Sequence, residues 1–265
     1  MGEQPPTRTR SEPVLHHRRH APAPVARVAL LDAFVVTEDG IERALSAAAQ
    51  RLVALVAFHG RPVRRDYAAT TLWPHLDTRI AGASLRSTLS RIRSASPYLM
   101  RAGSGDLDLA DGVCVDVYEF DDAASHVIDG TDGTNACDIV WRGRFTAELL
   151  PGWDDEWVIF ERERLREVGL HAIEAQAAQL ACEGQFTRAI TAAYTAIQLD
   201  PLRESAIRTL IEIHLAEGNR ALAAHCYMEF RERLRAELRM EPSGELTRLI
   251  SGLTVAHTGR PLHAL

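Results

Sequence analysis

The chain has 265 residues, of which 46% are hydrophobic and 25% are charged, and its formal net charge is −6. This length fits two domains, and the composition is typical of soluble globular proteins. No apolar run is long enough to cross a bilayer, so no membrane contact is expected. The four cysteines form no Cys-x-x-Cys pair. Their spacing argues against a zinc site or a disulfide framework and fits a cytoplasmic protein.

The charge is unevenly distributed, and every basic residue is arginine. Without lysine there is neither a P-loop lysine nor a Schiff-base lysine. Residues 1–121 hold 15 Arg and 14 acidic residues (+1), whereas residues 122–265 hold 15 Arg and 22 acidic residues (−7). Because phosphate repels acidic surfaces, we expect only the first half to approach nucleic acid.

Residues 1–24 are rich in proline and arginine and contain a His/Arg cluster at His16–His20. The segment has no apolar core, so it is not typical of a secretory signal. It is predicted to be a disordered arm. The cluster could bind a metal, touch phosphates or simply be solvated.

The next segment, residues 25–117, combines short strands with helices. Apolar periodicity and turn residues predict strands near 28–30, 34–36, 41–45, 98–101, 106–109 and 113–117, and helices at 52–58, 64–72 and 79–95. Asp39-Gly40 is a hairpin signal between two of these strands. A sheet, three helices and a hairpin in this order indicate a winged helix-turn-helix domain of the α+β class.

Residues 118–255 are predicted to form a second, all-α domain, followed by a tail at 256–265. Residues 118–152 are the boundary region. Beyond Asp154 nearly every segment has helical periodicity, which predicts helices at 155–183, 186–199, 202–217, 220–238 and 243–253. Gly184 and Gly218 each end one helix and precede the next, 34 residues apart. This is the period of tetratricopeptide helix pairs, although an ordinary helical bundle could also contain one such interval.

The predicted helix at 79–95 carries the most specific chemical pattern. On a helical wheel, Leu85, Leu89 and Ile92 form the core face, and serines and arginines lie opposite. No acidic residue occurs between Arg79 and Arg101. Solvated helices usually mix both charge signs, so a purely structural surface helix is the weaker of the two interpretations.

Such a face suits the major groove of DNA, because serines permit close approach and arginines donate to guanine or phosphate. The flexible hairpin that follows would be the wing. The candidate DNA-contacting residues are Arg64, Arg65, Arg79, Arg86, Ser87, Ser90, Arg91, Arg93 and Arg101.

Several motifs together resemble one family. They are Gln50–Val56 (QRLVALV), Gly60-Arg-Pro-Val-Arg-Arg65, Leu72-Trp73-Pro74, Ser84–Arg93 (SLRSTLSRIR), Val115-Asp116-Val117 with Phe120, Leu150-Pro-Gly-Trp153, Trp157, Arg162, Leu199-Asp-Pro-Leu-Arg-Glu204, Gly218, Glu237-Leu238 and Glu241-Pro242. This set resembles the antibiotic regulatory proteins (the SARP, or AfsR/DnrI/RedD-like, activators). In these proteins an OmpR-like winged helix precedes a bacterial transcriptional activation domain. One departure is Arg239, where the family usually has glycine, and it leaves open how the helix before it ends.

The resemblance implies a sequence-specific activator that binds direct repeats upstream of promoters as a side-by-side dimer. It further implies recruitment of RNA polymerase through sigma or other subunits, at antibiotic biosynthesis genes. In the wider OmpR-like fold, positions matching Arg86, Ser87, Ser90, Arg91 and Arg93 touch bases or phosphates. A repressor of the same fold, or a helical-repeat module that binds only proteins, are the alternatives.

The remaining features give no sign of catalysis. No nucleophile elbow or His-Glu-x-x-His motif occurs, so we expect no enzyme, cofactor or metal. Trp73, Trp153 and Trp157 could line a ligand pocket, but core and interface positions are the more usual role of tryptophan. The acidic run at 154–156 is typical of a helix start.

Overall fold

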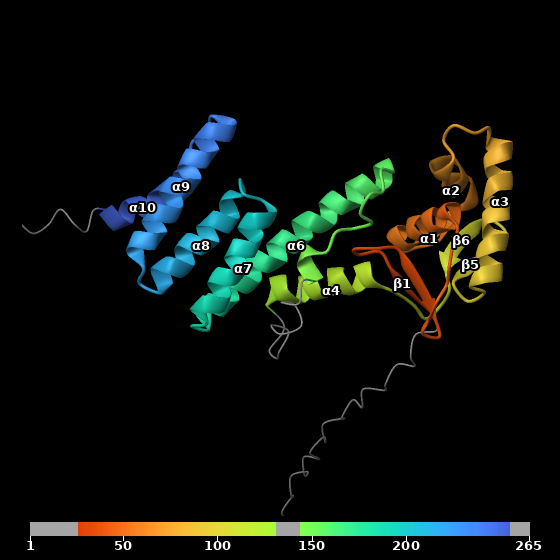
Figure 1. Ribbon diagram of the computed structural model, residues 1–265, viewed down its shortest axis with the longest axis horizontal. Coiled ribbons are helices and arrows are strands. Elements are labelled where there is room, and N and C mark those ends of the chain that lie inside the picture. Colours follow the sequence, from red (N-terminus) through yellow and green to blue (C-terminus); the bar gives the residue numbers. More distant parts are fainter. Residues whose placement is uncertain (1–25, 131–143, 255–265) are drawn as a thin grey trace, which may run out of the picture.

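The computed structural model describes residues 26–130 and 144–254. An α+β lobe lies at one end, and the helices that follow extend away from it in a row (Figure 1). The predicted arm, the predicted tail and the His16–His20 cluster lie outside the described residues.

The first sheet contains strands β1 (Ala26–Ala29), β2 (Val35–Glu38), β3 (Ile41–Glu42) and β7 (Val113–Val115) in the order β3-β2-β1-β7. Asp39 and Gly40 both have positive φ, 53° and 77°, so the predicted hairpin turn is confirmed. A strand at 113–117 was expected after the wing. The structure confirms the strand, and β7 pairs with β1 in parallel rather than with the wing hairpin. The end of this segment therefore returns to the first strand.

Three helices follow in the chain and contact a second sheet. They are α1 (Ala47–His59), α2 (Arg65–Leu72) and α3 (Thr78–Ala95). The second sheet has the order β4-β6-β5, with β4 (Val63–Arg64), β5 (Met100–Ala102) and β6 (Asp106–Leu109). Gly60 ends α1 in the left-handed conformation that glycine adopts at little cost. The winged helix-turn-helix is thereby confirmed.

Helix α4 (Asp116–Asp129) follows β7 directly and was not predicted. The Asp116 carboxylate is buried at its start and accepts the N–H groups of Leu30 (2.9 Å) and Leu31 (3.0 Å). Burial raises the pKa of Asp116, although these backbone donors oppose the shift. The carboxylate thus ties the end of β1 to α4.

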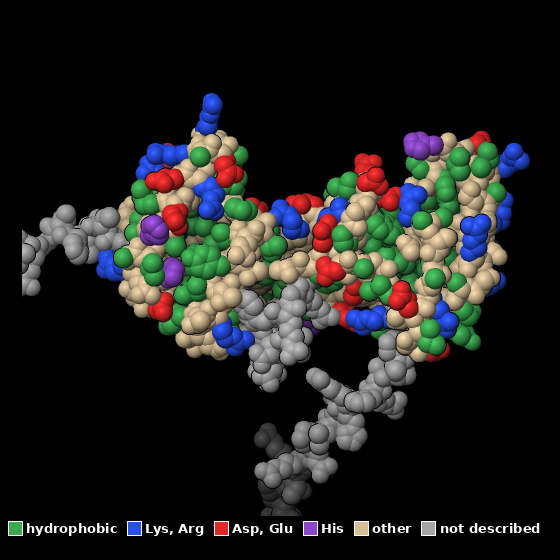
Figure 2. Space-filling view, in the orientation of Figure 1, with side chains coloured by type: hydrophobic (Ala, Val, Ile, Leu, Met, Phe, Trp, Pro, Cys, Tyr) green, Lys and Arg blue, Asp and Glu red, His purple; other side chains and the backbone are tan. Residues whose placement is uncertain are grey.

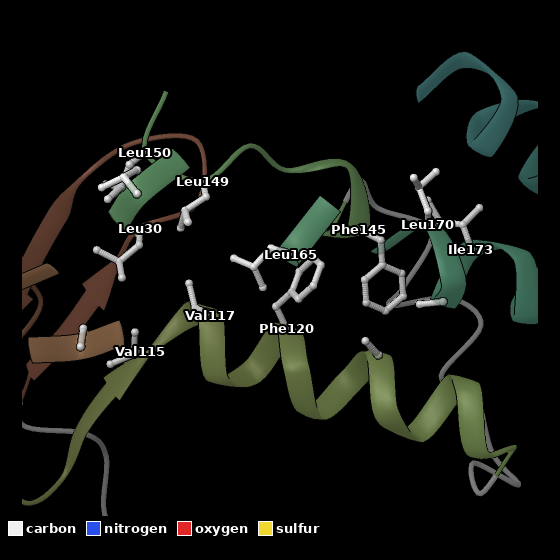
Figure 3. Close-up of a cluster of buried hydrophobic side chains, with 14 of the residues drawn as sticks. Leu30, Val115, Val117, Phe120, Phe145, Leu149, Leu150, Leu165, Leu170 and Ile173 are labelled. Atoms are coloured by element: carbon white, nitrogen blue, oxygen red, sulfur yellow. The ribbon is translucent and has the colours of Figure 1, made fainter. Parts of the chain in front are cut away.

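Helix α4 also packs against the helical half, and the two halves share a core (Figure 3). Phe120 of α4 and Phe145 meet edge to face, with ring centroids 5.3 Å apart. The Leu150 N–H donates to the Leu30 carbonyl over 2.9 Å, which continues the contact into the first sheet. The buried residues drawn at this joint include Val115, Val117, Leu149, Leu165, Leu170 and Ile173.

The helical half begins with a short 3-10 helix, η1 (Arg144–Thr146), and continues with α6 (Glu156–Cys182), α7 (Phe186–Leu199), α8 (Glu204–Ala216), α9 (Arg220–Leu238) and α10 (Gly244–Thr254). The predicted glycine repeat has the same geometry twice. Gly184 follows α6 with φ 74° and Gly218 follows α8 with φ 88°. Each glycine reverses the chain into an antiparallel partner helix, which confirms a tetratricopeptide-like arrangement.

Arg239 resolves the question raised by the missing glycine. It adopts φ 56° at the end of α9, and its N–H donates to the Arg235 carbonyl over 3.1 Å. The helix therefore ends at Leu238, as predicted, with an arginine in a left-handed position. A side chain in this conformation costs about 1–2 kcal/mol relative to glycine.

Candidate nucleic-acid interface

Helix α3 is held in place by its start and by one buried face. The Asp77 carboxylate caps the helix by accepting the Arg79 N–H over 2.9 Å. Leu85 and Ile92 are buried as predicted. Thr88 is also buried, which the wheel did not indicate because threonine is polar. The opposite face is therefore directed to solvent.

All of the candidate residues on that opposite face are exposed; they are Arg79, Arg86, Ser87, Ser90, Arg91 and Arg93. Within the part of the chain that the structure describes, the four arginine side chains of this set form no hydrogen bond or ion pair. Basic side chains lie along the edge of the molecule that α3 forms (Figure 2). Unpaired guanidinium groups at such an edge are available to an external anion.

A groove of about 250 Å³ separates α3 from the wing, the hairpin formed by β5 and β6. Arg65, Arg86 and Arg93 line it together with Ser90. The Arg65 Nε donates to the Gly103 carbonyl in the wing turn over 3.1 Å, and this bond fixes the guanidinium at the groove. The structure thus brings four of the predicted residues to one concave surface.

Ser96 is a further residue of this groove that sequence analysis missed. It is 1% exposed, and its hydroxyl oxygen has no hydrogen-bond partner among the described residues. A buried polar atom without a partner is uncommon in proteins. The only signal in the sequence was a serine directly after the end of the helix.

The other two predicted arginines lie in different surroundings. Arg64 is fully solvated and lies 3.9 Å from Asp66, a distance at which an exposed pair contributes little. Arg101 projects from the wing but pairs with Asp111 at 2.5 Å and with Asp108 at 3.4 Å. Its charge is therefore partly neutralised, unlike the charges on α3.

The tryptophans mostly serve packing. Trp153 stacks on Phe34 with ring centroids 5.9 Å apart, and Trp73 packs against the core. Trp157 meets Phe58 edge to face at 5.6 Å between α6 and α1. It also lines an open cleft.

Within residues 26–130 and 144–254, no helix is long and apolar enough to span a membrane. No group of three or more His, Cys, Asp or Glu side chains among the same residues could hold a metal ion.

The architecture is a winged helix-turn-helix followed by a helical second half, with a row of exposed arginines on α3. Residues 134–253 match the family described as bacterial transcriptional activator domain. The fold is similar to that of Mycobacterium tuberculosis EmbR, solved in complex with a low-affinity phosphopeptide. The TM-score is 0.70 at 20% identity, over 91% of this chain and 67% of that one. No curated protein matches the sequence significantly.

The family match supports the resemblance seen in the sequence for the second half of the chain, and the structural similarity shows that the fold is shared.

Proposed function

We propose that this protein binds double-stranded DNA through α3 and the wing and activates transcription from the bound site. The observation that carries this proposal is the row of arginines on α3 whose side chains have no partner among the residues that the structure describes. Surface arginines elsewhere in the protein mostly pair with carboxylates. Charges left unpaired along one helix face are the arrangement that phosphate binding requires.

The candidate residues fall into those that line the groove beside α3 and those that do not, and we assign the two sets different DNA contacts. Arg65, Arg86 and Arg93 converge on its concave surface and would hold a backbone phosphate. Ser87 and Arg91 do not line the groove and project into solvent, where base edges in the major groove would lie. Arg64, Arg79 and Arg101 would contact phosphates at the periphery.

The acidic helical half, in this proposal, contacts proteins. We assign residues 25–117 to DNA binding and residues 118–255 to activation, with α4 as the connecting element. Two copies would occupy direct repeats side by side, because a single winged helix buries little surface on DNA. The helical half would recruit RNA polymerase in the cytoplasm, at genes for secondary metabolites.

The test is a gel shift with promoter DNA identified by genome-wide footprinting. Arg91→Ala is expected to weaken binding to the footprinted site about tenfold and to relax its sequence preference, since one base-reading arginine contributes about 1–3 kcal/mol. The matched control is Arg233→Ala, which removes an exposed arginine from α9 in the acidic half. The control is expected to bind like the parent protein.

Two results would argue against the proposal. Equal binding by Arg91→Ala and the parent protein would remove α3 as the reading helix. Absence of any footprint at every salt concentration would favour a module that binds only proteins. Transcription in vitro, with and without the protein, separates activation from repression.

A further inference from the structure

A second concave surface lies between the two halves, away from the α3 groove. It has a volume of about 850 Å³ and is walled by α1 and α2 on one side and by the start of α6 on the other. Figure 2 shows the molecule indented here, between the α+β lobe and the upper end of α6, with hydrophobic side chains inside the indentation. Pockets for small organic ligands usually measure about 300–1,000 Å³ and often lie between domains.

The walls of this cleft are aromatic. Phe58 and Trp157 form an edge-to-face pair at its base, and Tyr67 stands against His59 at 5.2 Å. Phe160 borders the cleft with 71% of its surface exposed. The indole nitrogen of Trp157 is buried and has no hydrogen-bond partner among the described residues. Exposed aromatic rings are a feature that a bound organic molecule would cover.

The charge of the cleft is negative. Its single arginine, Arg51, is already paired with Asp155 across the two halves. Asp154 and Glu156 also border the cleft and form no ion pair or hydrogen bond among the described residues. Acids at the start of a helix interact favourably with its dipole, and this explains their presence. The helix dipole does not explain why these two carboxylates lie beside the exposed aromatic rings of the cleft.

We propose that this cleft binds a small organic cation with an apolar or aromatic body. The ring faces attract a cation through their quadrupoles, and the free carboxylates add a directional charge. The same carboxylates disfavour anions, and the aromatic walls suit an organic body rather than a bare metal ion. This inference does not depend on DNA binding, and it adds a ligand that contacts both halves of the protein.

The probe pair is tetraphenylphosphonium and tetraphenylborate, ions of nearly equal size and shape but opposite charge. Calorimetry on the full chain is expected to show saturable binding of one phosphonium per chain and no saturable binding of the borate. The variant Asp154→Asn/Glu156→Gln removes both free carboxylates and is expected to weaken phosphonium binding about tenfold. Phe160→Ala is expected to weaken it about threefold, without loss of folded structure because Phe160 is exposed.

The matched control is Glu212→Gln/Glu232→Gln, which removes two exposed carboxylates from α8 and α9, far from the cleft. It changes the net charge equally and is expected to bind the phosphonium like the parent protein. Equal binding of the two probes, equal loss in both double variants, or no saturable phosphonium binding would each overturn the proposal. It would also be overturned if the cleft variant instead abolished self-association of the chain, because the occupant would then be a second copy.

Discussion

Arginines are used differently at the two ends of the molecule. On α3 the arginines are exposed and free of partners within the described residues. In the helical half most of them are paired: Arg203, for example, contacts Glu167 at 2.7 Å and Glu174 at 2.8 Å. Arg166 likewise bridges Glu163 at 3.0 Å and Asp200 at 3.6 Å.

This difference between paired and unpaired arginines indicates two different roles for the guanidinium charge. A guanidinium held between carboxylates positions one helix against another and is not available to an external anion. A guanidinium without a carboxylate partner is available to an external anion, and on α3 several such groups lie on one helix face. A net charge of −6 is therefore compatible with DNA binding, because most of the excess acidic residues lie in the helical half, where many of them are paired with arginines.

The largest effect is expected at the joint between the two regions. A Cβ atom added to Gly169 of α6 would lie 2.7 Å from the Phe145 carbonyl oxygen and 3.3 Å from the Phe120 ring. Gly169→Ala should therefore lower the free energy of unfolding by about 2–3 kcal/mol in urea titrations. The control is Gly82→Ala on α3, where the added atom meets only the Arg86 side chain at 3.6 Å. This change should be neutral or stabilising by up to about 1 kcal/mol. Equal losses would show that the joint is not tightly packed.

The next effect separates paired from unpaired arginines. Arg203→Ala should lower the free energy of unfolding by about 1–2 kcal/mol, because it removes the positive charge beside the largely buried Glu174 carboxylate and leaves the Ser205 hydroxyl as a neutral donor. Arg91→Ala should change stability by less than about 0.5 kcal/mol. Chemical denaturation of both variants measures the contrast. Similar losses of stability in the two variants would mean that the arginines of α3 also stabilise the fold.

A smaller effect distinguishes phosphate contact from base reading. Arg93 lines the groove beside α3, so Arg93→Ala should weaken specific and non-specific DNA about equally, by roughly threefold to tenfold. The slope of log affinity against log salt should become shallower by about one, the value for one lost phosphate contact. Anisotropy titrations at several salt concentrations give both quantities. An unchanged slope with altered sequence preference would reassign Arg93 to base reading.

The wing offers the reverse experiment. Asp111 pairs with Arg101 and is itself 87% exposed. Asp111→Asn removes the closer of the two carboxylates that pair with Arg101 and leaves Asp108 at 3.4 Å, so DNA affinity should rise about twofold at low salt and less at high salt. The double variant Asp111→Asn/Arg101→Ala should lose this gain. A rise that persists in the double variant would come from lost repulsion rather than from Arg101.

The sequence was sufficient for the elements whose signals are local. Helices α3, α7 and α9 were expected within a residue of their bounds, because periodic apolar positions and glycine or proline stops mark them. The exposed side of α3 followed from the same periodicity. These features depend on near neighbours in the chain, which the sequence presents directly.

The features that it did not predict depend on contacts between distant residues. Helix α4 was overlooked because its start, Asp116, is a buried acid whose role depends on N–H groups 85 residues earlier. The parallel pairing of β7 with β1 is likewise non-local. Ser96 became part of the groove only when α3 and the wing came together. The spacing of residues along the chain does not indicate such long-range contacts.

The smallest expected effect tests an exception within the helical half. His214 of α8 is 5% exposed, and its Nδ1 has no partner among the described residues. Burial lowers the pKa of His214, and Glu217 only partly opposes this shift. Below about pH 6.5 the unfolded chain binds a proton that the folded chain excludes. Stability is therefore lost as pH falls from that point toward the folded pKa. Urea titrations at pH 7.5 and 5.5 should show a smaller acid-induced loss for His214→Gln than for the parent protein. An equal loss would mean that the folded protein binds the proton on His214 at pH 5.5 as readily as the unfolded chain does. In that case the charge of this buried ring would be compensated by its surroundings, as most charges of the helical half are.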